Sequence, residues 1–424
     1  MKGLLMLVGS MLITLASCTT SPNHSTALPC TTASVSVTCF LQSGQATLNA
    51  TEDPFAWSSG AIELAIAFDT ADQSQSAFDL YQQALSRSTQ IEDSDRRGAV
   101  LVEAMVGLAD FKPTDEALNL ANEIIRIADL SDAGRQDDLL AKHVVVKAVH
   151  GNKAEALQAG LDLPQTNARE ENYKAVSLRK LANQFAKDGD FERSAIALEA
   201  ITMSISYYQA MARSDVARAA YAADRDELAE ALLGAADSIA RAQDSGYFIA
   251  AALRDIGYSY HLAGVSDLAD AYFDEAVTVA RTAEKQNEMA RATSRIATRK
   301  ADAGLQQDAI AILIAADTLA SKIESPQTKG YSYYEIVGSA AFAGRFQIAR
   351  SWLANVPDMP LGSSSSMLSA AKRDLAWGLA RNGDLVDARL ECDAIPHARE
   401  KAQCFARVVR VILQPNMTAL PRYL

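Results

Sequence analysis

The apolar residues of this chain recur in blocks with a pitch near 40 residues, and each block holds two amphipathic stretches joined by a short turn. Within a stretch the apolar residues lie three and four positions apart, which is the spacing of one face of an α-helix. Alternation of period two is not sustained anywhere in the array. Nine such blocks lie between residues 64 and 395. The pattern therefore predicts a stack of helical hairpins that share one continuous core.

One turn residue per block sets the register, with spacings of 35 to 40 residues. These residues are Asp72, Lys112, Gly151, Gly189, Asp224, Gly264, Gly304, Gly344 and Gly383. Glycine suits a tight connection that needs positive φ, and Asp is a common substitute. Five residues after each turn stands a small side chain that lets the two helices approach closely: Ala77, Ala117, Ala156, Ser194, Ala229, Ala269, Ala309, Ala349 and Ala388. A generic alanine-rich helical protein is the alternative, but composition alone would not space the glycines so evenly.

One block resembles a tetratricopeptide repeat, with the large, small, aromatic and turn residues of that family at the right offsets. The positions that carry the resemblance are Ile256, Gly257, Tyr260, Gly264, Ala269, Phe273 and Ala276. A second block resembles it almost as well, at Leu181, Ala182, Phe185, Gly189, Asp190 and Phe191. The resemblance covers residues 58–413 and implies an all-α fold, an α-α superhelix (a right-handed solenoid) of about nine helix-turn-helix repeats that forms a single curved rod.

Two features depart from that family. The pitch is near 40 residues, whereas the standard unit has about 34. Proline is also displaced: Pro164, Pro357 and Pro396 stand thirteen residues past their turn residues. Each should end the second helix of its hairpin early, because proline cannot continue a helix.

The N-terminus is typical of an exported protein. Lys2 precedes an apolar run from Leu4 to Leu15, which is too short to span a bilayer but suits a secretory signal. The run ends in Leu-Ala-Ser-Cys, which resembles the bacterial lipoprotein cleavage site. Residues 1–17 are then the signal peptide, and Cys18 carries the acyl chains. An ordinary cleaved signal with an incidental Cys18 is the alternative. Thr19 is not an aspartate, and by resemblance to the sorting rules of enterobacterial lipoproteins this favours the outer membrane, with the protein facing the periplasm.

Residues 18–57 are rich in Ser and Thr and are predicted to form a tether after the lipidated cysteine. Four other cysteines agree with an oxidising compartment. Local disulfides are predicted between Cys30 and Cys39 and between Cys392 and Cys404, with buried free thiols as the alternative. Residues 414–424 read as a frayed tail.

Charge and motifs exclude several classes of function. The net charge of −12 argues against nucleic acid as a partner, because such binding depends on neutralising phosphates. The five histidines have no zinc-type spacing, and no phosphate loop, dinucleotide fingerprint or nucleophile elbow is found. Ser177 with Lys180 and Ser369 with Lys372 have the spacing of a penicillin-binding nucleophile motif, but no Lys-Thr-Gly triplet accompanies them. We therefore expect no catalytic site, no cofactor and no metal.

In the resembled family the first helix of each repeat lines a concave groove that holds an extended peptide or a helix. Carried over by offset, the groove positions form a basic and aromatic set: Arg179, Asn183, Arg218, Tyr221, Arg254, Tyr258, His261, Arg291, Tyr331, Tyr334, Arg373, Trp377 and Arg381. Arginine forks pair with carboxylates, so the set favours an acidic peptide. The alternative is that these arginines pair with acids of the chain itself, such as Asp215 and Asp255, and that the aromatic residues pack between repeats.

These features together predict a non-catalytic scaffold or adaptor for protein-protein interaction, anchored by lipid in the bacterial envelope. Its partner would be another envelope protein or an acidic peptide segment. The alternative is a structural or assembly subunit of a larger envelope complex, in a secretion, pilus or cell-wall machinery.

Overall fold

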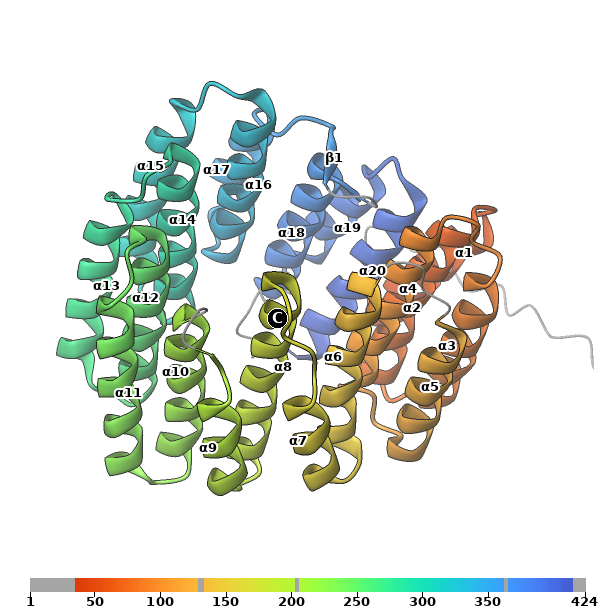
Figure 1. Cartoon of the computed structure of the whole chain (residues 1–424). Coiled ribbons are helices and arrows are strands. Elements are labelled where there is room, and N and C mark those ends of the chain that lie inside the picture. The colour runs from red at the N-terminus through yellow and green to blue at the C-terminus, as the bar shows by residue number, and fades with distance from the viewer. Residues whose placement is uncertain (1–34, 129–132, 203–205, 362–364, 415–424) are drawn as a thin grey trace, which may run out of the picture. The chain divides into compact units, whose positions relative to one another are not determined.

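The computed structural model describes residues 35–128, 133–202, 206–361 and 365–414, which form twenty α-helices and two strands of two residues each (Figure 1). Ser36–Leu424 is one compact unit. The predicted all-α superhelical repeat fold is confirmed. None of the described helices has both the length and the apolar character that crossing a bilayer requires.

The helices fall into two sets that alternate along the chain. The first helices of the hairpins are α2 (Pro54–Thr70), α4 (Ser94–Leu108), α6 (Ala133–His150), α8 (Ala168–Lys187), α10 (Ser206–Ala222), α12 (Gly246–Leu262), α14 (Gln286–Asp302), α16 (Pro326–Phe342), α18 (Met367–Arg381) and α20 (Ala398–Leu413). The second helices are α3 (Ser74–Ser88), α5 (Thr114–Ile127), α7 (Lys153–Leu161), α9 (Phe191–Glu199), α11 (Asp226–Arg241), α13 (Ser266–Ala280), α15 (Gln306–Ser321), α17 (Phe346–Leu353) and α19 (Leu385–Asp393).

The turns between paired helices have the conformation that the register predicts. Positive φ occurs at seven of the nine turn residues: Asp72, Gly189, Asp224, Gly264, Gly304, Gly344 and Gly383. Lys112 and Gly151 are the exceptions. Lys112 precedes Pro113, and a residue before proline is confined to extended conformations. Gly151 donates its N–H to the Lys147 carbonyl at 2.9 Å and so continues the hydrogen-bond pattern of α6.

Small side chains allow the two helices of a hairpin to pack closely. All nine predicted small residues are buried, with exposures of 0 or 1%. At Gly257 in α12, an added Cβ would stand 3.1 Å from the Ala269 carbonyl oxygen of α13. The backbones therefore approach so closely that neither helix has room for a larger residue at this crossing.

The displaced prolines shorten three second helices as predicted. α7, α17 and α19 have eight or nine residues and end three or four residues before Pro164, Pro357 and Pro396, respectively. Most other second helices have 14 to 16 residues. After α17 the chain forms a small antiparallel pair of β1 (Pro360–Leu361) and β2 (Ser365–Ser366) before α18 begins.

The array is not an open rod. Each first helix packs on the next first helix, and the series continues from α18 to α20 and from α20 back to α2. The predicted tether is also wrong in part, because Val37–Asn49 forms helix α1, which packs on α20. α1 takes the place of a second helix. It packs mainly on α20, which acts as its first helix, and less on α2, which is the first helix of the next hairpin. The two ends of the described chain thus form a tenth hairpin, α20 with α1, that closes the array.

Apolar contacts hold this closure together. Phe40 of α1 is fully buried and lies 6.2 Å from Phe405 of α20, measured between ring centroids.

Cys392 of α19 is joined to Cys404 of α20 by a disulfide with a Cα–Cα distance of 5.5 Å. Cys39 is also disulfide-bonded, whereas Cys30, its predicted partner, lies outside the described residues. So do the predicted signal peptide, Cys18, and residues 415–424 of the predicted tail.

Candidate binding surface

The predicted groove residues all lie on six consecutive first helices, α8 to α18. Their arginines mainly contact acids of the same chain. Arg179 donates to Asp215 of the next first helix at 2.6 Å, and Arg218 also contacts Asp215. Arg254 donates to its neighbour Asp255 at 2.8 Å. The ion pairs that the sequence left open as an alternative are thus present, and they use much of the basic charge of the groove.

Burial and charge act in opposite directions on these acids. Burial raises the pKa of Asp215, but the guanidinium groups of Arg179 and Arg218 outweigh it and hold the pKa below its usual value. The pKa of Asp255 is likewise lowered, against its burial, by Arg254 and Arg299. Both carboxylates are therefore ionised at neutral pH and neutralise the arginines beside them.

Several predicted aromatic residues are also structural. Trp377 is 1% exposed and stacks on Phe342, with ring centroids 5.5 Å apart. The Arg381 guanidinium lies 4.1 Å from the centroid of the Phe342 ring. Tyr258 is buried beneath Arg299, whose guanidinium lies 4.6 Å from the ring centroid. Tyr221 donates to Glu230, and Tyr334 is 5% exposed. Asn183 and His261 are half-buried on α8 and α12.

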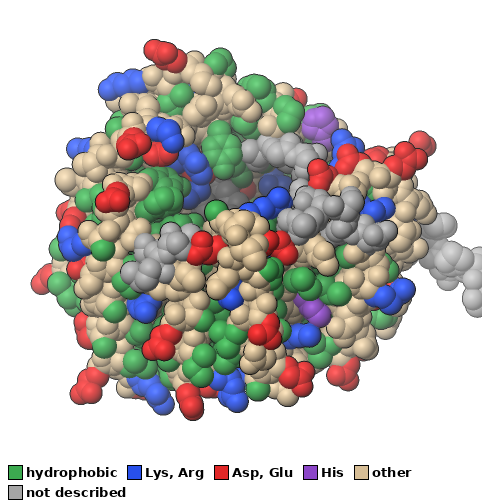
Figure 2. Space-filling model, viewed as in Figure 1, with side chains coloured by type: hydrophobic (Ala, Val, Ile, Leu, Met, Phe, Trp, Pro, Cys, Tyr) green, Lys and Arg blue, Asp and Glu red, His purple; other side chains and the backbone are tan. Residues whose placement is uncertain are grey.

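A partly exposed group of five aromatic residues and one arginine remains on four consecutive first helices. We call it the aromatic strip; it consists of Tyr207, Tyr208, Tyr247, Phe248, Arg291 and Tyr331. All six are half-buried. Tyr207 stacks on Phe248 at 4.4 Å, and the Arg291 guanidinium lies over Tyr331 at 4.7 Å. Figure 2 shows a hollow in the viewed face of the molecule, with Lys and Arg side chains in and around it and hydrophobic side chains gathered along one side.

The sequence contains a signal for four strip residues that the groove offsets did not select. The adjacent pair Tyr207 and Tyr208 recurs 40 residues later as Tyr247 and Phe248, one repeat along the array. Each pair opens a first helix, at the second and third positions of α10 and α12. The groove offsets concern the middle and end of each helix, so they select Arg291 and Tyr331 but not these pairs.

A second feature is a cavity of about 330 Å³ where the ends of the array meet; we call it the seam cavity. Its lining includes Ile62, Glu63 and Ile66 of α2; Val102, Glu103, Val106 and Gly107 of α4, followed by Asp110; Arg373 of α18; and Arg399, Gln403, Arg407 and Arg410 of α20. Of the predicted groove residues, only Arg373 lines it. The cavity thus depends on helices that are about 300 residues apart in the chain and that sequence periodicity does not place together.

Polar contacts cross the seam on one side of this cavity. Arg399 donates to Ser59 and to Glu103, both at 2.6 Å, and Arg407 donates to Glu63 at 2.9 Å. Burial raises the pKa of Glu63, but Arg407, Arg410 and Arg373 together hold it at about 2. Glu63 is therefore a single carboxylate that faces three guanidinium groups.

Both serine-lysine pairs are engaged in the helical packing. Ser177 is buried and donates to the Ala141 carbonyl at 2.9 Å. Lys372 donates to the Ala394 carbonyl at 3.1 Å, and Ser369 is buried against Ser366. Neither lysine is hydrogen-bonded to its serine, so neither pair has the geometry of an activated nucleophile. No cluster of three or more His, Cys, Asp or Glu suited to a metal occurs among the described residues.

Comparison with family models and with curated proteins gives no match for this chain. Among solved structures it is similar to a Rap protein complexed with competence and sporulation factor, at 15% identity and a TM-score of 0.30, over 85% of this chain and 99% of that one. It is also similar to a circular tandem repeat protein with novel repeat topology, at 10% identity and a TM-score of 0.25, over 91% of this chain and 100% of that one. At these TM-scores neither likeness bears on what this chain binds.

Proposed function

We propose that this protein is a non-catalytic scaffold that binds a partner protein at the aromatic strip and is anchored by lipid in the bacterial envelope. The strip is the observation that carries the proposal. Tyr and Arg dominate the energetics of protein interfaces, because their rigid, amphipathic groups add contact area at a small entropic cost. Here four tyrosines, Arg291 and Phe248, all half-buried and in contact with one another, lie across four consecutive helices.

The charges beside the strip indicate the kind of partner. Arg291 and Arg295 share Glu335 of α16, at 3.2 and 2.9 Å. The Arg291 and Arg295 guanidinium groups also lie over the rings of Tyr331 and Tyr247, so two cationic groups border the aromatic rings. A partner segment that combines an aromatic or aliphatic side chain with an acidic one fits this surface. The envelope location rests on the N-terminal sequence, with its apolar run and Cys18.

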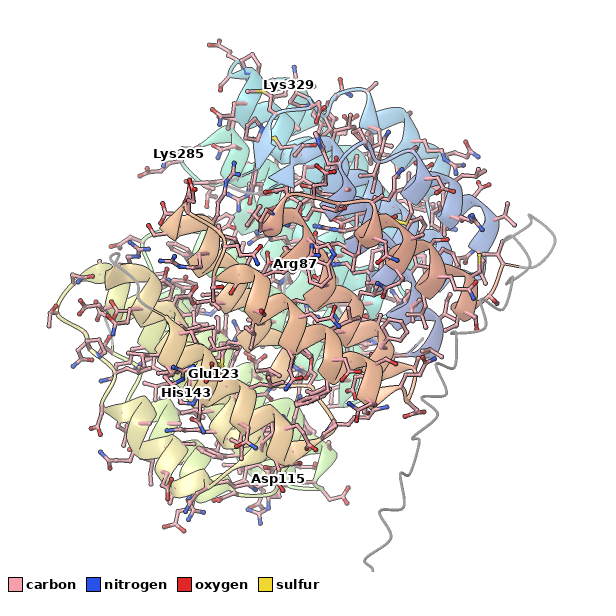
Figure 3. All side chains as sticks on the ribbon, turned by 90° about the vertical axis from the view of Figure 1, so that its right-hand side faces the viewer. Arg87, Asp115, Glu123, His143, Lys285 and Lys329 are labelled. Atoms are coloured by element: carbon pink, nitrogen blue, oxygen red, sulfur yellow. A yellow bond between two sulfur atoms is a disulfide. The ribbon has the colours of Figure 1, made fainter. Side chains whose placement is uncertain are left out.

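Site-specific photo-crosslinking in intact cells tests the proposal. A photoreactive phenylalanine analogue at position 331 should give one crosslinked band with a partner. The same analogue at Asp115, an exposed residue of α5 at the periphery in Figure 3, should give none. Replacing Tyr247 with alanine should weaken the 331 band roughly tenfold, since a hot-spot aromatic contributes more than 1 kcal/mol. Cys18→Ala should release the protein from the membrane fraction.

Other outcomes would count against this function. Crosslinks from position 115 within a stoichiometric assembly, and none from 331, would favour the assembly-subunit alternative. The absence of crosslinks at both positions would contradict a scaffold role.

A further inference from the structure

We propose that the seam cavity binds a small carboxylate that has a short aliphatic stem. The site lies apart from the aromatic strip, on α2, α4, α18 and α20, and it does not depend on partner binding there. Its lining has two chemically different sides, one basic and one apolar.

The basic side offers hydrogen-bond donors that lack acceptors. Arg373 is only 7% exposed, and it donates through Nη1 to Gln403 at 2.7 Å, but its Nε–H has no partner among the described residues. Nε and Nη1 of Arg407 and Nε of Arg410 are also buried and lack a hydrogen-bond acceptor among the described residues. A buried guanidinium donor without an acceptor is costly, and a carboxylate oxygen would supply the missing partner.

The apolar side consists of aliphatic side chains from the first two hairpins. Ile62 and Ile66 come from α2, and Val102 and Val106 come from α4. Val106 is 42% exposed and so offers apolar surface that the stem of a ligand can cover. An aliphatic stem would cover these groups while its carboxylate reaches the arginines. The volume of about 330 Å³ is at the small end of the range for ligand pockets.

The charge of the lining limits the charge of the ligand. Four arginines face Glu63, Glu103 and Asp110 in the cavity. Asp374 adjoins Arg373 and acts on both Arg373 and Arg407, so these positive and negative charges balance. A carboxylate adds a single negative charge to this lining, whereas a phosphate, with a charge of about −1.5 at neutral pH, adds more.

Binding at this site should stabilise the closed array. The lining comes from both ends of the chain, so the ligand contacts all four helices only when α20 is packed on α2. A ligand that binds only the closed form raises the stability of that form by mass action.

Hexanoate is a suitable probe for the whole chain, with hexanol, acetate and phosphate for comparison. Titration calorimetry should give saturable binding of hexanoate, and the thermal midpoint should rise with hexanoate concentration. Hexanol lacks the charge and acetate lacks the stem, so each should bind at least about tenfold more weakly. Phosphate should not compete. No saturable binding of hexanoate would mean that the cavity holds only water, and an equal effect of hexanol or phosphate would also overturn the proposal.

Three variants separate this site from the overall fold. Arg373→Lys keeps the charge but loses the planar fork, and it should weaken hexanoate binding roughly tenfold. Val106→Asn alters a partly exposed wall residue, so the protein should fold, and it should weaken hexanoate but leave the affinity for acetate unchanged. Arg126→Gln removes an exposed arginine of α5 and should change neither affinity. If Arg373→Lys and Val106→Asn both bind hexanoate as the wild type does, the assignment is wrong.

Discussion

At the scale of single residues, the same side chain has different roles at equivalent positions of the array. Arg179, Arg254 and Arg373 all stand ten residues before their turn residues. The first two donate to carboxylates, whereas Arg373 donates to the neutral amide of Gln403. Between Arg179 and Arg373 the difference arises from the neighbouring helix, because α20 presents Gln403 to Arg373 and α10 presents Asp215 to Arg179, whereas the partner of Arg254 is Asp255 of its own helix.

Glu63 should be a major contributor to stability at the seam. Glu63→Gln leaves the three guanidinium groups around it without their shared carboxylate, and we expect a loss of about 3–5 kcal/mol in the free energy of unfolding. The pKa of Glu63 is lowered to about 2, so its ionisation stabilises the fold above pH 4.5 and ceases to do so as pH falls toward 2. The difference between wild type and variant, measured by urea denaturation, should therefore narrow over that range.

Arg126 and Glu123 provide the comparison, because their ion pair is exposed on α5. Glu123→Gln should leave the free energy of unfolding almost unchanged at neutral pH, because water screens this exposed pair. Equal losses for Glu63→Gln and Glu123→Gln would show that the seam charges are solvated.

At the scale of elements, the hairpin is defined by its turn residue and by a small residue that faces the first helix. Hydrophobic periodicity predicts where the helices form. How closely the two helices of a hairpin approach each other depends on side-chain volume at the point where they cross. Ala269 of α13 is 1% exposed at this crossing, and the neighbouring Leu268 is 43% exposed. Two adjacent positions of one helix therefore have opposite sensitivity to size.

Ala269→Leu should overpack the crossing of α12 and α13. Inserting three carbon atoms into a tight contact costs about 1–3 kcal/mol, which thermal denaturation would detect as a lower midpoint. The matched change Leu268→Ala, one residue away, should alter stability by less than about 0.5 kcal/mol. The reverse order of effects would show that the register of α13 is wrong.

At the scale of the whole described unit, closure is the feature that distinguishes this array from an open stack of repeats. An open stack leaves the apolar faces of its terminal repeats exposed and needs capping units. Here α1 supplies the missing second helix for α20, and each end of the array covers the other. This closure also creates the seam cavity, which an open array would lack.

Phe40→Ala tests the role of α1. Phe40 is fully buried against α20, and its loss should cost about 3–5 kcal/mol. Hydrogen exchange should accelerate first in α1 and α20, because the seam is the contact that has been weakened. Phe273→Ala, an equally buried change in α13, should destabilise to a similar degree without selective exchange at the seam. If both variants show the same exchange pattern, α1 is not a separate closing element.

The sequence by itself determined the helices, the hairpins and most of the turns. Helical periodicity, small residues and turn glycines act over a few residues, so their physical effect can be read locally. The same locality explains why the short helices before Pro164, Pro357 and Pro396 were predictable. It also explains why the aromatic pairs of α10 and α12 are recognisable as a repeated feature.

Only the tertiary structure decided that the array closes, that residues 37–49 belong to it, and which arginines are neutralised. Closure depends on the rotation from each repeat to the next, a small angle that is summed over ten hairpins and that no single residue encodes. The pairing of a charge likewise depends on which side chain the neighbouring helix presents. The amphipathic sequence of α1 favours burial of one face, but the partner of that face lies about 350 residues away.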